Sequence, residues 1–190
     1  METFLISLTT ITVAEIGDRT QLLSLLLVAR YRRPLPIIAG ILCATLASHT
    51  IAGYLGVWFG NLLPPRTLDI LLGVSMIAMA LWTLKPDKVH QSDSLPSAAG
   101  AFLATLSGFF LAEIGDKTQI ATVALAAAYP NLVQVIAGTT LGMLAANVPV
   151  VFLGQAFADR LPMKAIHYAA AALFLILGAV FVGRTIWRPL

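Results

Sequence analysis

The sequence predicts an all-α membrane protein with six transmembrane helices, arranged as two inverted three-helix repeats. Of the 190 residues, 58% are hydrophobic and 11% are charged, and the mean hydropathy is +0.87. Soluble domains contain about 25% charged residues. The apolar runs are continuous and reach the roughly 20 residues that a helix needs to cross a bilayer. They therefore differ from the short alternating segments of membrane β-barrels.

Six apolar segments follow one another along the chain, separated by charged or proline-containing turns. The first ends at a basic cluster (residues 30–33), the second at Pro64 and Pro65, and the third at Lys85. Changes of composition such as these mark the ends of spans. The expected spans are residues 3–29, 35–61, 67–84, 97–128, 132–158 and 163–186.

The two halves of the chain repeat one another at a constant offset of 98 residues (113 − 15 = 98). Identical residues recur at this offset without a gap: Glu15 and Glu113, Gln21 and Gln119, Tyr31 and Tyr129, Gly40 and Gly138. Because each unit has three helices, the second copy must enter the membrane from the opposite side. Many secondary transporters consist of such inverted repeats. We expect a first repeat at 1–86, a polar linker at 87–96 and a second repeat at 97–190, forming one membrane domain.

The distribution of basic residues predicts that both termini face away from the cytoplasm. With the N-terminus outside, seven Lys and Arg residues lie in inner loops and three in outer regions, in agreement with the positive-inside rule. The inner set is Arg30, Arg32, Arg33, Lys85, Lys88, Arg160 and Lys164, and the outer set is Arg66, Arg184 and Arg188. This scattering does not indicate nucleic-acid binding. The first apolar run contains acids and lacks a basic start, so we expect it to be retained rather than cleaved.

Charged residues within the apolar segments are concentrated in a motif that occurs twice, AEIGDRTQ at 14–21 and AEIGDKTQ at 112–119. An acid at the centre of a spanning helix costs at least about 2.5–3.5 kcal/mol, so such a cluster indicates a functional site. Glu and Asp three positions apart share one helix face. The glycine between them allows the backbone to bend. We therefore expect the first and fourth helices to be kinked or broken at the two motifs.

The charge balance of the two motifs favours a divalent cation. Four acids (Glu15, Asp18, Glu113 and Asp116) stand against two bases (Arg19 and Lys117), which leaves a net charge of −2. The repeat relation brings the two acidic faces together near the centre of the membrane. Carboxylate, amide and hydroxyl oxygens are hard ligands that suit Ca²⁺, Mn²⁺ or Mg²⁺.

A purely structural interpretation of the motifs is also open. Asp18 and Gln21 match a helix capping box, and Arg19 is able to neutralise the acids as a structural ion pair. The second motif offers the same interpretation through Asp116, Gln119 and Lys117. This interpretation gives neither glutamate a role, and capping is compatible with ion binding.

Further polar residues are candidates for the ion path. Thr20, Gln21, Thr118 and Gln119 flank the acids in both halves. His49 and Asn147 lie at the same offset, each in the middle of the second span of its half. Imidazole is a common ligand of transition metals. A hydrogen-bonded packing role is the alternative for His49.

The doubled motif resembles the Glu-x-Gly-Asp-(Lys/Arg)-(Ser/Thr) signature of the UPF0016 family, also called the Gdt1 family of cation transporters. The resemblance spans the whole chain, and neither copy departs from the signature. It implies secondary transport of Mn²⁺, with Ca²⁺ also handled in eukaryotic members, in exchange for protons. It also implies that Glu15, Asp18, Glu113 and Asp116 bind the ion. The short N-terminus resembles the prokaryotic branch, for which Mn²⁺ export across the plasma membrane is expected.

The predicted mechanism is competition between protons and a divalent cation for the same carboxylates while the repeats rock to open the site to alternate sides. The ion is substrate, and no cofactor is expected. A Ca²⁺/H⁺ antiporter and a passive cation channel are alternatives. An intramembrane aspartyl protease is another, but its Gly-x-Gly-Asp pattern has glycine where both copies here have glutamate. The sequence leaves open whether the protein forms a homo-oligomer.

Overall fold

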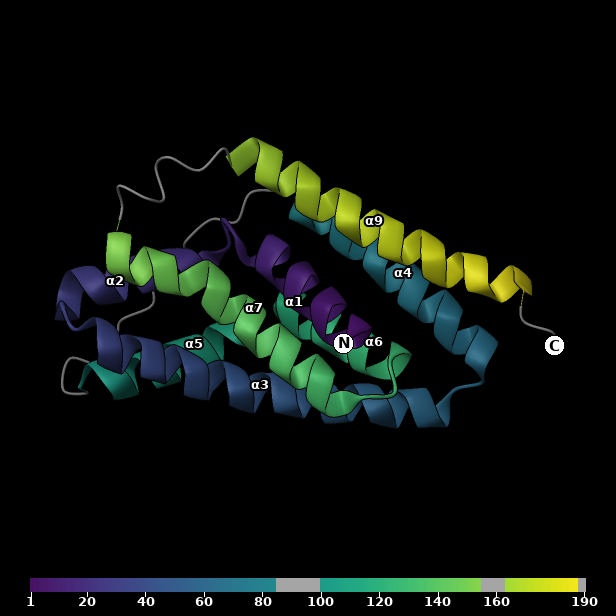
Figure 1. The fold of residues 1–190 in the computed structure, drawn as a ribbon, viewed down its shortest axis with the longest axis horizontal. Helices are drawn as coiled ribbons and strands as arrows, with labels where there is room; N and C mark the ends of the chain where they lie inside the picture. The colour runs from purple at the N-terminus through teal and green to yellow at the C-terminus, as the bar shows by residue number, and fades with distance from the viewer. Residues whose placement is uncertain (85–99, 155–162, 188–190) are drawn as a thin grey trace.

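The computed structural model describes residues 1–84, 100–154 and 163–187. These residues form eight α-helices and no strand, which confirms the all-α prediction (Figure 1). The predicted linker at 87–96 lies outside the described residues, as do Lys85, Lys88, Arg160 and Arg188.

Four of the six predicted spans are single helices. They are α3 (Pro34–Leu62), α4 (Pro65–Thr83), α7 (Leu132–Leu153) and α9 (Met163–Trp187). All four contain a stretch long and apolar enough to cross a membrane. Prolines at the first turns of α3 and α4 suit these positions, because the first N–H groups of a helix have no partner within it.

The first and fourth predicted spans are not continuous helices. The first forms α1 (Glu2–Glu15) and α2 (Arg19–Tyr31), and the fourth forms α5 (Ala101–Glu113) and α6 (Lys117–Ala128). Helices α1 and α5 each end at the glutamate of a motif, and α2 and α6 each begin directly after its aspartate.

The helices of the two halves interlock. Helix α1 packs on α7, and α5 packs on α3, while α3 and α7 also contact each other. Helices α4 and α9 pack side by side along one edge of the bundle (Figure 1). The motif-bearing helices of each half therefore lie against the second span of the other half.

Glycines allow the two crossings to be close, and the two crossings use equivalent residues. A Cβ added at Gly40 would lie 2.9 Å from the carbonyl oxygen of Phe102, and one added at Gly138 would lie 2.6 Å from that of Phe4. Gly40 and Gly138 differ by 98 positions, as do Phe4 and Phe102. The α3–α5 and α7–α1 contacts thus repeat each other residue by residue.

The buried faces of α3 and α7 coincide at the same offset. The buried residues of α3 recur at alternating intervals of three and one, and those of α7 follow the same pattern apart from the additional buried Thr140, which places them on one face of each helix. Nine pairs are buried in both helices: 37 and 135, 40 and 138, 41 and 139, 44 and 142, 45 and 143, 48 and 146, 49 and 147, 52 and 150, 53 and 151.

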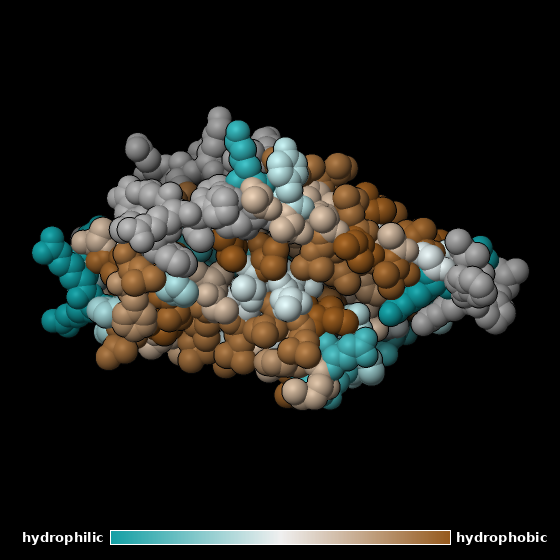
Figure 2. Space-filling model, turned by 45° about the horizontal axis from the view of Figure 1, so that its top comes forward, coloured by the Kyte–Doolittle hydropathy of each residue, from teal (hydrophilic) through white to brown (hydrophobic). Residues whose placement is uncertain are grey.

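The outer surface of the bundle is apolar. Hydrophobic residues cover much of the face shown in Figure 2, around a pale patch near its middle, and the most hydrophilic residues lie at its left end, upper edge and lower right. Many large apolar side chains are exposed, including Trp58, Leu81 and Leu111. A contiguous apolar surface of this kind indicates contact with lipid.

The close crossing of α7 and α1 generates a stability prediction. We expect Gly138→Ala to lower the melting temperature of the detergent-solubilised protein, because the new methyl group would lie 2.6 Å from the Phe4 carbonyl oxygen and 2.8 Å from Ser7 Cβ. Overpacking of this kind costs about 1–3 kcal/mol. Gly183→Ala in α9 is the matched control, because nothing lies within 4 Å of its added Cβ. A melting temperature as high for Gly138→Ala as for Gly183→Ala would contradict the close crossing.

Candidate functional site

Both motifs form a tight break between two helices. Gly17 has φ 84° and Gly115 has φ 72°, in the left-handed region that glycine adopts without steric cost. The N–H of Asp18 donates to the carbonyl oxygen of Glu15 at 3.0 Å, which closes the turn. Asp116 makes the same bond at 3.1 Å to Glu113. Each break therefore holds the glutamate and the aspartate of a motif close to each other.

The aspartate and glutamine of each motif cap the following helix. Oδ2 of Asp116 accepts hydrogen bonds from the N–H of Thr118 at 3.2 Å and from its hydroxyl at 2.9 Å. Oε1 of Gln119 accepts from the N–H of Gly115 at 2.8 Å. The first motif makes the equivalent bonds through Asp18, Thr20, Gln21 and Gly17. The capping interpretation is thus correct for one oxygen of each aspartate, and the other oxygen is available for a different contact.

The second oxygen of each aspartate forms an ion pair with the base of the opposite motif. Nη2 of Arg19 lies 3.1 Å from Oδ1 of Asp116, and Nζ of Lys117 pairs with Oδ1 of Asp18. We call these two contacts the crossed ion pairs. Arg19 also donates to the carbonyl oxygen of Ala112 at 2.7 Å, directly before the second break. The predicted charge-balancing role of the two bases therefore agrees with these contacts, and each pair links the two halves of the chain.

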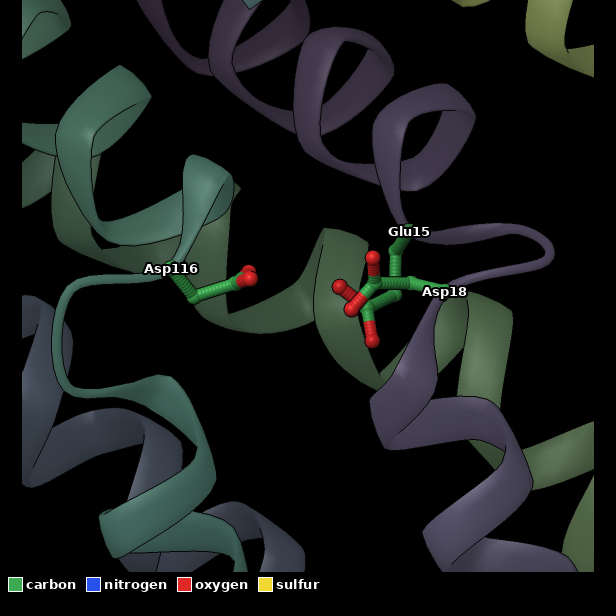
Figure 3. Close-up of side chains that lie close together, drawn as sticks. All are labelled: Glu15, Asp18 and Asp116. Carbon is green, nitrogen blue, oxygen red and sulfur yellow. The ribbon is translucent and has the colours of Figure 1, made fainter. Parts of the chain in front are cut away.

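Three of the four predicted acids converge. Glu15, Asp18 and Asp116 each offer an oxygen, and these oxygens all lie within 4.8 Å of one another. Figure 3 shows Glu15 and Asp18 reaching from the first break towards Asp116 at the second. The exposed fractions of these residues are 0%, 0% and 3%. A single metal ion with ligand distances of about 2.0–2.6 Å could contact all three carboxylates.

Glu113 lies outside this group of three. Its Oε1 accepts a hydrogen bond of 2.6 Å from the hydroxyl of Thr45 on α3. Glu15, its equivalent in the first motif, instead accepts a bond of 3.1 Å from Nδ2 of Asn147 on α7. The two glutamates therefore have different partners although their motifs are almost identical.

Asn147 connects Glu15 to the rest of α7. Its Oδ1 accepts from the hydroxyl of Ser24 at 2.9 Å, and its Nδ2 also lies 3.1 Å from the carbonyl oxygen and 3.2 Å from Sδ of Met143. Within the described residues, Oε2 of Glu15 is buried and has no hydrogen-bond partner. That oxygen is one of the lone-pair donors available to a cation.

The other predicted ion-path residues lie around the acids. The amide of Gln21 donates to the carbonyl oxygen of Ala146 at 3.1 Å, and that of Gln119 donates to the hydroxyl of Ser48 at 3.1 Å. His49 is completely buried, and neither ring nitrogen has a hydrogen-bond partner among residues 1–84, 100–154 and 163–187. The packing role given as the alternative for His49 requires a hydrogen bond, and those residues supply none.

Four residues whose side chains contact this network were not predicted from the sequence: Ser24, Thr45, Ser48 and Met143. A signal for two of them was present. Thr45 and Met143 differ by 98 positions, and each precedes a predicted polar residue, His49 or Asn147, by one helical turn. A search for non-identical pairs at the repeat offset would have found them.

The two bases differ in their access to solvent. The side chain of Arg19 is 40% exposed, whereas that of Lys117 is 3% exposed. The Arg19–Asp116 pair therefore lies nearer the surface of the bundle than the Lys117–Asp18 pair.

Comparison with known proteins identifies the family. The family described as "Divalent cation/proton antiporter GDT1" matches residues 3–91 and 101–186. The chain belongs to the GDT1 family. A Vibrio cholerae protein named "Putative manganese exporter" is 53% identical, over 93% of this chain and 88% of the relative. "GDT1-like protein sll0615" of Synechocystis is 29% identical, over 93% and 95%. "Protein PAM71, chloroplastic" of Arabidopsis thaliana is 40% identical over 47% of this chain and 24% of the relative. No solved structure matches the chain.

Membership of the GDT1 family confirms the resemblance seen in the motifs. The chain is an integral membrane protein of a family that exchanges divalent cations for protons. It is a transporter and not an enzyme, so the protease alternative is removed.

The unequal exposure of the crossed ion pairs generates a prediction. We expect Lys117→Met to lower the melting temperature more than Arg19→Met, because Lys117 is the more deeply buried base. Loss of one partner of a buried pair costs about 3–5 kcal/mol. The loss for Arg19→Met should be smaller because the Arg19 side chain is 40% exposed, although its partner Asp116 is buried. We also expect added Mn²⁺ to raise the melting temperature of Lys117→Met more than that of wild type, since the cation would take the place of the missing charge. An equal fall in melting temperature for the two variants, with no larger rise on adding Mn²⁺ to Lys117→Met than to wild type, would contradict this account.

Proposed function

We propose that this protein exports Mn²⁺ from a bacterial cytoplasm across the plasma membrane in exchange for protons. The observation that carries the proposal is the convergence of Glu15, Asp18 and Asp116, whose oxygens lie within 4.8 Å of one another inside an apolar bundle. Lys117 and Arg19 each pair with one of these carboxylates, and a divalent ion between the three would remove the repulsion that remains.

The choice of Mn²⁺ is supported by chemistry and by the relatives. Carboxylate and amide oxygens suit Mn²⁺, and the Vibrio cholerae relative is named "Putative manganese exporter". The same oxygens suit Ca²⁺, so a Ca²⁺/H⁺ antiporter is the second candidate. In both cases the ion is the transported substrate.

Coupling to protons follows from the contacts of the carboxylates. One oxygen of Asp18 and one of Asp116 are engaged by Lys117 and Arg19. A cation that binds the cluster competes with these bases, and protons compete with it for the same oxygens. If the site releases the metal on one side of the membrane and protons on the other, the two are exchanged through a single site.

Alternating access is supported by the repeated contacts of the two halves. We propose that residues 1–86 and 97–190 form inverted three-helix repeats joined by the linker at 87–96, and that the motif-bearing helix pairs α1–α2 and α5–α6 each form one of six membrane crossings. The equivalent glycine crossings and the coincident buried faces of α3 and α7 support this arrangement. Rocking of one repeat against the other would exchange the environments of Glu15 and Glu113. Glu113 would then join the ion in the opposite state.

The orientation in the membrane follows from the basic residues. We propose that both termini face away from the cytoplasm. The basic end of α2, with Arg30, Arg32 and Arg33, would then lie on the cytoplasmic side, and the α3–α4 turn at Arg66 would lie outside.

Proteoliposomes that contain a pH-sensitive dye test the transport proposal. We expect external Mn²⁺ to enter and the lumen to become more alkaline, because protons leave as the metal enters. When the lumen is acidic, we expect Mn²⁺ to accumulate in it against the Mn²⁺ gradient, because protons leave the lumen down their own gradient. Lower external pH should slow Mn²⁺ uptake, since protons compete for the carboxylates.

Substitutions in the motifs supply the controls for this assay. Glu15→Gln and Glu113→Gln are each expected to abolish uptake while the protein stays folded, and Glu2→Gln is the matched control because Glu2 is an exposed acid at the start of α1. Uptake of Mn²⁺ without proton counterflow removes the antiport proposal. Flux that never runs against a gradient would identify a passive channel instead.

A further inference from the structure

Met143 places a sulfur atom next to the carboxylate cluster. It is completely buried on α7, and its Sδ accepts a hydrogen bond of 3.2 Å from Nδ2 of Asn147. The same nitrogen donates to Oε1 of Glu15 at 3.1 Å. The thioether sulfur and the carboxylate oxygen therefore both lie within hydrogen-bond distance of one amide nitrogen, which also lies 3.1 Å from the carbonyl oxygen of Met143.

We propose that Sδ of Met143 is a ligand of the transported cation, beside the oxygens of Glu15, and that this sulfur makes the site discriminate transition metals from Ca²⁺ and Mg²⁺. The proposal rests on the proposed function and deepens it. The lone pairs on Sδ of Met143 and Oε1 of Glu15, which accept from the Asn147 amide in this structure, would also attract a cation. Oε2 of Glu15, which is buried and has no hydrogen-bond partner among the described residues, supplies a further oxygen.

The surroundings hold this arrangement in place. Met143 and Asn147 are four residues apart on α7, so their side chains share one helix face. The hydroxyl of Ser24 on α2 donates to Oδ1 of Asn147 at 2.9 Å and fixes the amide. Contacts from α1, α2 and α7 therefore meet at the sulfur side of the site.

Comparison of the two halves shows that the fold does not require a thioether at the position of Met143. The residue equivalent to Met143 in the first half is Thr45, which donates to Glu113 at 2.6 Å. The two halves thus place chemically different groups beside equivalent glutamates. Met143 places its sulfur 3.2 Å from the amide nitrogen that binds Glu15.

Ligand softness gives the sulfur its proposed effect. Ca²⁺ and Mg²⁺ bind oxygen ligands and gain little from a thioether. Softer divalent ions are bound better by sulfur, so a mixed oxygen and sulfur site should shift the preference away from Ca²⁺ most strongly towards Cd²⁺ and less towards Mn²⁺, which also suits oxygen ligands.

Isothermal titration of the purified full-length protein with Mn²⁺, Ca²⁺ and Cd²⁺ tests the proposal. Met143→Leu conserves volume, so the fold should be kept. We expect the ratio of Mn²⁺ to Ca²⁺ affinity to fall at least about tenfold, with a larger fall for Cd²⁺, as for other changes at metal sites. Met76→Leu is the matched control because Met76 is also completely buried but lies on α4, and it should leave the ratio unchanged.

The outcomes separate a ligand from a positioning residue. If Met143→Leu weakens all three ions equally, or leaves all three unchanged, Met143 does not contact the ion and the proposal is overturned. X-ray absorption of bound Cd²⁺ gives a direct check in a Cys43→Ala background, since Cys43 is exposed on α3 and is itself able to bind Cd²⁺. A sulfur neighbour is expected with Met143 and not with Leu, and its absence from the Met143 protein would overturn the proposal.

The same measurements distinguish failure of this proposal from failure of the proposed function. If the wild-type protein binds none of the three ions, both are wrong. If Glu15→Gln abolishes binding of all three but Met143→Leu keeps the selectivity of the wild type, the carboxylate site stands and only the sulfur ligand is rejected.

Discussion

The crossed ion pairs are the contacts on which the arrangement of this protein depends. Each pair joins an aspartate of one motif to the base of the other, Asp18 with Lys117 and Asp116 with Arg19. A charge buried in an apolar bundle is costly unless it is paired, so the two helix breaks must meet. The glycine crossings of α1 on α7 and of α5 on α3 let the backbones come close enough for this to happen. The glycine crossings and the positions of the charges therefore both serve to bring the two helix breaks together.

The same requirement connects stability to the proposed transport. The groups that hold the two halves together are the groups that a divalent cation would occupy, so metal, protons and the two bases compete for a small number of carboxylate oxygens. Helix breaks supply these oxygens at the ends of short helices, where polar backbone groups line a protein interior rather than lipid. The two bases differ in exposure, 40% for the Arg19 side chain and 3% for that of Lys117, so the two pairs hold their carboxylates in different environments.

The site departs from the symmetry of the repeat at the second helix of each half. The two EIGD motifs are identical, yet Glu15 contacts Asn147 and Glu113 contacts Thr45. The residues at equivalent positions of α3 and α7 differ in kind, a hydroxyl against a thioether and an imidazole against an amide. The helix facing each motif therefore decides the chemistry of its glutamate, which is why the two halves need not bind the ion in the same way.

The sequence by itself determined what depends on local chemistry. Long apolar runs, prolines at helix starts and the doubled EIGD motif were enough to predict an all-helical membrane protein, the bounds of α3, α4 and α9 to within two residues, the family and the candidate acids. Only the tertiary structure decided which groups meet. Thr45 lies 68 positions from Glu113, and Asn147 lies 132 positions from Glu15. Contacts at such separations depend on how distant helices pack, and residue types and spacing along one helix carry no record of them.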